Sequence, residues 1–226
     1  MIKDDILYLT TLCGITGEEK EVSEAVADLL APLVDEIKID QMGNVIGIRH
    51  CKRTNAERLM LTAHLDQVGL VITDIVDEGF ARVAGLGVDS RVMLGEKLIV
   101  LTDHGKLHCC SAALPPHLQK DGDDSATVRM DEVWIDLGMD GEKARSLIHP
   151  GDRVAFDVQP TMLLNNRVTA AALDDRLGIA CILSALRALA NQELSCELQI
   201  LFTNMEESNH EGCAAAMHLL KPDSVG

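Results

Sequence analysis

The stretch that most constrains the fold runs from residue 175 to residue 203, where a helical pattern leads into a wholly apolar run. Residues 175–190 predict an amphipathic helix. Its apolar face is expected to hold Leu177, Cys181, Leu183, Leu186 and Leu189. Residues 197–203 contain "LQILF", which is typical of a strand buried on both faces. Because a strand that joins its sheet through a helix pairs in parallel, this stretch predicts an α/β domain.

The chain changes in character between residues 69 and 160. Short β-forming runs recur there with Gly and Asp between them, and one short helix is expected around "DGEKARSLI". A polar stretch, "KDGDDSATVRM", is expected to be an exposed loop. The pattern predicts a small β-barrel or sandwich over residues 69–160. It would be inserted into an α/β domain made of residues 1–68 and 161–226.

The first part of the chain contributes its own elements to that domain. Helical spacing covers residues 3–12 and 18–36, with Thr16 as a candidate N-cap of the second helix. Residues 36–50 alternate around the turn pair Gly43-Asn44 and predict a hairpin. Residues 58–64, "RLMLTAH", predict a short strand that ends in a histidine.

Composition excludes some classes of partner. The chain has 20 Lys and Arg against 36 Asp and Glu, a formal net charge of −16, so nucleic acid and anionic membranes would be repelled. We expect no secretory signal at the start and no segment long enough to cross a bilayer. The 7 cysteines follow no disulfide or zinc-ribbon spacing. They predict reduced thiols in a cytoplasmic protein, several of them acting as small core residues.

His64 and Asp66 stand where the predicted strand 58–64 ends. If the extended conformation continues, their side chains project to the same side. An imidazole can then bind a metal ion through one ring nitrogen while the carboxylate holds the other, which fixes the tautomer. Taken alone, His-x-Asp is common, and an incidental pair is the better interpretation.

Two acidic pairs stand at the ends of other predicted elements, Asp174-Asp175 before the helix and Glu206-Glu207 after the apolar strand. Acidic residues at a helix start are ordinary N-caps. A carboxylate can also bridge two metal ions ~3.5–4 Å apart. Two adjacent glutamates can serve one site only where the strand has ended. Together with His64 and Asp66, the pairs predict a metal site at the rim of one sheet.

Longer stretches, spread nearly from end to end of the chain, carry a family resemblance. They are "GITGEEKEV", "DQMGNVIG", "LTAHLDQVGLVI", "GVDSRVMLGEKLIV", "PPHL", "VWIDLG", "HPGDRVAF", "NNRVTAAALDDRLG" and "NMEESNHEG". In these stretches the sequence resembles the dinuclear metalloaminopeptidases, which include glutamyl, deblocking and tetrahedral aminopeptidases, some also called endoglucanase-like. The resemblance implies a three-layer, zinc-peptidase-like α/β domain interrupted by a β-barrel that serves dimerisation or oligomerisation. It also implies peptide substrates and homo-oligomers, from dimers to dodecameric shells.

The resemblance further implies roles for five residues. His64 would bind one of two divalent ions, and Asp66 would orient it. Asp174 would bridge both ions, and Glu207 would bind the second. Glu206 would be the general base toward the attacking water. The expected ions are zinc or cobalt, with manganese as a further candidate.

The sequence departs from the family pattern in several places. Gln67 stands where a Glu is usual, Ala171 where a Lys is frequent, and "SNHEG" follows the paired glutamates in place of a more usual glycine turn. Asn209 tolerates the left-handed conformation better than most residues, so the turn can still form. These changes concern substrate preference more than fold. His117, in "PPHL", receives no role.

Family members continue beyond the position of Gly226, and that part carries two more metal ligands, an Asp and a His. A metal site of this kind takes about three protein ligands per ion. The 226-residue chain alone is therefore expected to be inactive, with an uncovered edge or face at strand 197–203. Two alternatives stay open: a piece of an active enzyme, or a truncated, inactive homologue with an assembly or structural role.

A glycosidase is a third class that paired carboxylates could suggest. Its two catalytic carboxylates must flank a sugar bond with ~5–9.5 Å between them, which adjacent residues rarely achieve. The chain also has only 1 Trp, 1 Tyr and 3 Phe to stack on sugar rings. A glycosidase therefore fits poorly.

Overall fold

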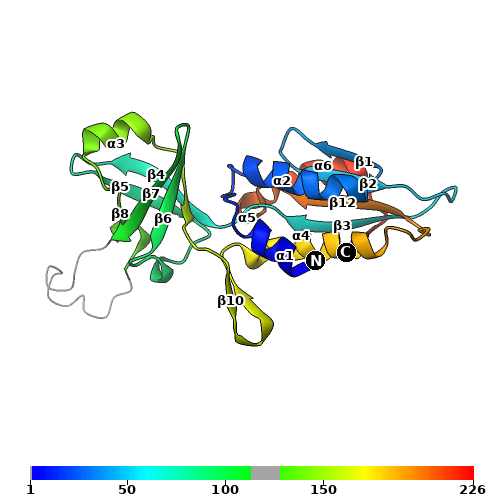
Figure 1. Cartoon of the computed structure of the whole chain (residues 1–226). Coiled ribbons are helices and arrows are strands. Elements are labelled where there is room, and N and C mark those ends of the chain that lie inside the picture. Colours follow the sequence, from blue (N-terminus) through cyan, green and yellow to red (C-terminus); the bar gives the residue numbers. More distant parts are fainter. Residues whose placement is uncertain (1, 113–127) are drawn as a thin grey trace. The chain divides into compact units, whose positions relative to one another are not determined.

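The computed structural model describes residues 2–112 and 128–226, which form two compact units (Figure 1). The first unit comprises Met1–Gln67 and Gln159–Gly226, and the second comprises Val68–Val158. The stretch "PPHL" with His117, and most of the polar stretch from residue 120 to 130, lie outside the described residues. The catalytic role predicted for the first unit and the assembly role predicted for the second stay predictions.

The first unit is built on a five-stranded sheet of order β1-β2-β12-β3-β13. Its strands are β1 (Glu36–Ile39), β2 (Val45–Arg49), β3 (Arg58–His64), β12 (Glu197–Thr203) and β13 (Ser224–Val225). The predicted hairpin is confirmed, since β1 and β2 pair antiparallel. The predicted parallel pairing is confirmed as well, since β12 runs parallel to β3.

The strand β12 is the centre of this sheet, because it also pairs antiparallel with β2. Residues 198–203 are all buried. The expectation of an uncovered edge or face at this strand was therefore wrong: the hairpin formed by residues 36–49 covers the side opposite β3.

Helices cover both faces of the sheet (Figure 1). They are α1 (Ile2–Leu9), α2 (Lys20–Leu30) with the 3-10 turn Ala31–Leu33, α4 (Leu173–Ala188), α5 (Glu206–Asn209) and α6 (Glu211–Leu220). Alternate side chains of β12 point to opposite faces. Leu198, Ile200 and Phe202 pack into one core with α1, α2 and α4, and Leu201 packs into a second core with α6. The predicted three-layer α/β architecture is confirmed.

The buried face of α4 differs from the predicted stripe. Leu177 is 44% exposed and Cys181 is also exposed. The residues that α4 buries are Arg176, Ile179, Ala180, Leu183 and Leu186. A charged residue is almost never fully buried. The buried residues also follow helical spacing, but a search for apolar residues does not find this stripe because it includes Arg176.

The second unit is a closed barrel of order β4-β5-β8-β7-β6-β9. Its strands are β4 (Gly69–Ile75), β5 (Phe80–Leu86), β6 (Lys97–Thr102), β7 (Gly105–Ala112), β8 (Trp134–Asp136) and β9 (Arg153–Phe156). The predicted short helix is α3 (Gly141–Leu147). Closure leaves the barrel core lined by aliphatic side chains such as Leu70, Val100 and Ile135.

A separate two-stranded hairpin, β10 (Thr161–Leu163) with β11 (Arg167–Thr169), precedes α4. Of the helices in the described ranges, none is long and apolar enough to span a bilayer.

All 7 cysteines carry free thiols. Cys109 and Cys196 pack against the two larger cores, but neither is fully buried. These two cysteines lie at the edge of a core and not inside it, so the expectation that several cysteines are core residues is met only in part.

Candidate metal and catalytic site

The site lies where two neighbouring parallel strands end. His64, the last residue of β3, is the register partner of Thr203, the last residue of β12. Because the carboxyl ends of parallel strands meet at one edge of the sheet, the segments that follow both strands lie side by side. This geometry brings the stretch after His64 next to the paired glutamates.

His64 is nearly buried, at 9% exposure, and both ring nitrogens have partners. Nδ1 lies 3.0 Å from the main-chain oxygen of Asp66 and 3.6 Å from its carboxylate. Nε2 lies 3.0 Å from Oδ1 of Asp174. The partner that holds Nδ1 at hydrogen-bond distance is thus the carbonyl of Asp66, not the carboxylate expected from the sequence. Burial lowers the pKa of His64, but the Asp66 and Asp174 carboxylates outweigh it and raise the pKa to about 9.

The carboxylate of Asp66 is occupied by other groups. It is fully buried and accepts a hydrogen bond from the Thr16 hydroxyl at 2.8 Å. It also accepts the backbone N–H groups of Glu206 and Glu207, both at 3.0 Å. Burial raises the pKa of Asp66, yet His64 and these hydrogen bonds bring it below its usual range. Asp66 therefore anchors the glutamate turn as well as the histidine.

Thr16 does not cap a helix, which corrects the expectation from sequence. The N-cap position of α2 is Glu19, and it makes no side-chain capping bond. The Thr16 side chain is instead turned toward Asp66. The hydroxyl donates to an ionised carboxylate, which is a stronger bond than the neutral one in which an N-cap hydroxyl accepts from a helix N–H.

Asp174 and Asp175 take different roles at the start of α4, where both have non-helical backbone angles. The Asp174 side chain is 90% exposed and reaches Nε2 of His64. Oδ1 of Asp175 accepts the N–H of Gly178 at 2.9 Å. Asp175 is therefore the capping residue of the pair, and Asp174 is the one that faces the site.

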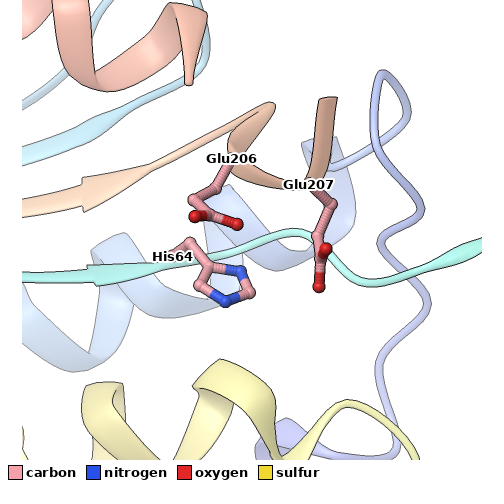
Figure 2. Close-up of side chains that lie close together, drawn as sticks. All are labelled: His64, Glu206 and Glu207. Carbon is pink, nitrogen blue, oxygen red and sulfur yellow. The ribbon is translucent and has the colours of Figure 1, made fainter. Parts of the chain in front are cut away.

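Glu206 and Glu207 open α5, directly after Met205 in the left-handed conformation (φ 58°). One carboxylate oxygen of each and one ring nitrogen of His64 lie within 4.8 Å of one another. Figure 2 shows both carboxylates near the His64 ring. Burial raises the pKa of Glu207; His64 opposes this, and the carboxylates of Glu206, Asp66 and Asp174 add to it. The turn thus presents two acidic groups to one imidazole.

His210 is a neighbour of the site that the sequence did not assign. Its Nδ1 lies 3.1 Å from Oε1 of Glu206, and its side chain is 70% exposed. The signal was the i, i+4 spacing of Glu206 and His210, which brings side chains together on a helix. The left-handed residues of this turn are Met205 and His210, and Asn209, which could also tolerate that conformation, is the last residue of α5.

The donor set fits a divalent cation. It combines one imidazole nitrogen with carboxylate oxygens, the ligands that zinc and related ions take in hydrolase sites. His64, Glu206 and Glu207 are close enough to share one ion, and Asp174 contacts the same imidazole from α4. The five residues singled out in the sequence therefore lie together at this edge of the sheet.

Solved structures resemble this fold closely. An aminopeptidase from the archaeon Desulfurococcus kamchatkensis matches with a TM-score of 0.90 and 32% identity, over 99% of this chain and 61% of that one. The TET1 peptidase of Pyrococcus horikoshii, described as able to assemble into a tetrahedron or a large octahedral shell, matches with a TM-score of 0.88 and 29% identity. That match covers 100% of this chain and 67% of that one.

Fold and site together define an aminopeptidase-like α/β protein with an inserted barrel. A relative from Acetivibrio thermocellus, called a putative aminopeptidase, is 30% identical over 97% of this chain. The model of the M42 glutamyl aminopeptidase family matches residues 43–225, and the chain belongs to that family. The chain spans 63% of the length of the Acetivibrio relative.

Proposed function

We propose that the first unit is the catalytic domain of a metal-dependent aminopeptidase that removes N-terminal residues from peptides. The observation that carries this proposal is the convergence of His64, Asp174, Glu206 and Glu207 at the rim of one sheet. Membership of an aminopeptidase family supports the peptide substrate.

His64 and Asp174 would hold one ion, and Asp174 and Glu207 would hold a second. Divalent ions in such a site polarise the scissile carbonyl and lower the pKa of a nearby water. Zinc and cobalt suit these nitrogen and oxygen donors, and manganese suits the carboxylates.

Glu206 is assigned as the general base. Its carboxylate lies beside the ligand atoms of His64 and Glu207, so it can accept a proton from a water that attacks a carbonyl in this space. The same carboxylate contacts the exposed side chain of His210. Asp66 supports both glutamates indirectly, since its carboxylate accepts their backbone N–H groups.

The test is Glu206→Gln, made in any longer natural form that contains this chain, because hydrolysis is expected there. Loss of a general base lowers turnover by about 10²- to 10⁴-fold. We expect that loss in the hydrolysis of unblocked peptides with added zinc, cobalt or manganese, while the metal content stays unchanged. Glu24→Gln, an exposed carboxylate on α2 that pairs with Lys20, is the matched control and should leave both unchanged. Loss of the metal together with turnover would make Glu206 a ligand instead of the base.

The assignment gives each ion two ligands from the described residues, fewer than the about three that such sites take. For the 226-residue chain alone we therefore expect weak metal binding and little hydrolysis. Equilibrium dialysis with zinc and a peptide assay check this. Two tightly bound ions with robust hydrolysis would overturn the ligand assignment.

The barrel is proposed to mediate homo-oligomers. The support is the likeness to the TET1 peptidase, whose description names a tetrahedron and an octahedral shell. Light scattering on the purified chain tests this, and a strictly monomeric mass at micromolar concentration would contradict it.

A further inference from the structure

Four consecutive backbone N–H groups, those of residues 204–207, each donate to a side-chain oxygen from a distant segment. The bonds are Asn204 N to Asn44 Oδ1 at 2.9 Å, Met205 N to Glu19 Oε1 at 3.3 Å, Glu206 N to Asp66 Oδ1 at 3.0 Å and Glu207 N to Asp66 Oδ2 at 3.0 Å. The three acceptors come from the start of α2, the β1–β2 turn and the end of β3. The segment that carries the two glutamates is thus held by side chains from three parts of the unit.

These bonds answer a local need. A chain that leaves a strand and begins a short helix has N–H groups without backbone partners. Met205 also adopts the left-handed conformation, which costs about 1–2 kcal/mol for a residue with a side chain. Hydrogen-bond acceptors from other segments can stabilise such a turn. The conformation of the turn sets the direction in which the side chains of Glu206 and Glu207 point.

Glu19 is well placed for this task. It is 5% exposed, and the oxygen that binds Met205 also accepts the N–H of Gly17 at 2.6 Å. One carboxylate therefore joins the loop before α2 to the residue that precedes Glu206.

Asn44 holds the same segment at both of its ends. It is fully buried, and its Nδ2 donates to the carbonyl of Gly212 at 3.0 Å and to Asp40 at 2.9 Å. The fit around it is tight, since a Cβ at Gly212 would lie 2.2 Å from the oxygen of Asn204 and 2.5 Å from Oδ1 of Asn44. The amide of Asn44 thus spans residues 204 and 212.

We infer that Glu19 and Asn44 are positioning residues for the glutamate pair: they fix the backbone at residues 204 and 205 so that Glu206 and Glu207 face His64. This rests on the proposed function as far as the metal and the base are concerned. Neither residue is among those that could hold a metal ion with His64. Each acts through the backbone of its neighbour in space.

The test uses Glu19→Leu and Asn44→Leu in the full chain, which remove the acceptors at similar volume. Glu19→Gln keeps an oxygen for Met205 and should restore wild-type behaviour. The matched control is Gln199→Leu, which removes another buried amide of the same unit, one in β12 that donates to the carbonyl of Leu220 at 3.2 Å. If Glu19→Leu does not fold, Glu19→Asp withdraws the same oxygen by one methylene.

Two readouts separate positioning from general stability. Hydrogen exchange of the metal-free protein should show amides 204–207 at least tenfold less protected in the Leu variants, with the barrel strands unchanged. The apparent Kd for cobalt, followed by its visible spectrum, should rise by about 10- to 100-fold, the usual effect of losing a supporting partner. Gln199→Leu should lose stability without either change.

Protection at 204–207 that equals that of the Gln199→Leu control would overturn the inference, as would cobalt affinity unchanged in both Leu variants. A wild-type protein that binds no cobalt would instead count against the proposed function. In that case the exchange measurement still decides whether Glu19 and Asn44 fix the turn.

Discussion

The two units differ in what they bury. Within the described part of the barrel unit, the buried side chains are almost all aliphatic, and Ser111 is the one buried polar residue. The other buried polar and charged side chains lie in the α/β unit, and they include Glu19, Asn44, Asp66 and Arg176. The barrel follows the general rule for protein interiors, and the α/β unit departs from it around its site.

The two units also differ in how well their buried polar groups are paired. Ser111 is satisfied, since it donates to the carbonyl of Met93 and accepts the N–H of Glu96. Arg176 donates through Nη1 to the carbonyl of Leu9, but its Nε and Nη2 are buried without a hydrogen-bond partner among the described residues. Burial lowers the pKa of Arg176 to about 10.

Buried polar groups cost stability unless they are paired. A unit that keeps such groups around one edge of its sheet is expected to hold the function there. The difference supports the proposal that the α/β unit holds the chemistry and the barrel a structural part, and the following variants test that proposal.

The largest effect is expected from Asp66→Ala. It leaves the Thr16 hydroxyl and the N–H groups of Glu206 and Glu207 without their acceptor. We expect a loss of about 3–5 kcal/mol in the free energy of unfolding of the α/β unit, together with loss of cobalt binding. Urea unfolding followed by hydrogen exchange, resolved for each unit, measures it.

Ile135→Ala in β8 of the barrel is the matched comparison, because Ile135 is fully buried. Its truncation should cost about 2–5 kcal/mol in the barrel and leave cobalt affinity unchanged. If both variants lost cobalt binding equally, the proposal that the metal site belongs to the α/β unit alone would be wrong.

A smaller effect is expected from two helix caps with the same geometry. Asp175 accepts the N–H of Gly178 at the start of α4, and Asp140 accepts the N–H of Lys143 at the start of α3, both at 2.9 Å. Replacing either by Ala should cost about 1 kcal/mol of unfolding free energy, measured by thermal or urea unfolding. Only Asp175→Ala should also weaken cobalt binding, because the next residue toward the N-terminus is Asp174. Equal cobalt affinity in both variants would show that the position of Asp174 does not depend on the cap.

The elements that frame the site could be predicted from sequence. The apolar runs that became β3 and β12 carry a strong local signal; β3 ends at the candidate residue His64, and β12 ends at Thr203, shortly before the candidate Glu206. A parallel pairing of the two strands then brings the ends together. This part of the site follows from periodicity and from the order of the elements.

The support of the site could not be predicted in the same way. Thr16 bonds a residue 50 positions away, Asn44 one that is 160 away and Glu19 one that is 186 away. Locally, a threonine before a helix has an equally good use as an N-cap, so only the folded chain decides between the two. The same holds for Arg176, whose burial depends on packing that apolar patterning does not describe.

The smallest effect concerns a surface histidine of the α/β unit. His50 follows β2, and its ring lies between Glu197 of β12 and Glu36 of β1, at 3.2 and 2.7 Å. Its hydrogen bonds with Glu197 and then Glu36 raise the pKa of His50 above 6.5. The charged imidazole therefore links three strands of the sheet.

For a histidine whose pKa is raised on folding, the stabilisation is fully present below the unfolded pKa of about 6.5 and is lost as the pH rises through the folded pKa. The side chain is 49% exposed, so the gain should stay below about 1 kcal/mol and shrink in high salt. His50→Gln should thus lower the stability of the α/β unit at pH 5.5, measured by urea unfolding, and have little effect at pH 9. The barrel should not respond at either pH. An equal loss at both pH values would mean that His50 contributes packing and not charge, and the pH dependence of this unit would then have to come from the groups around His64.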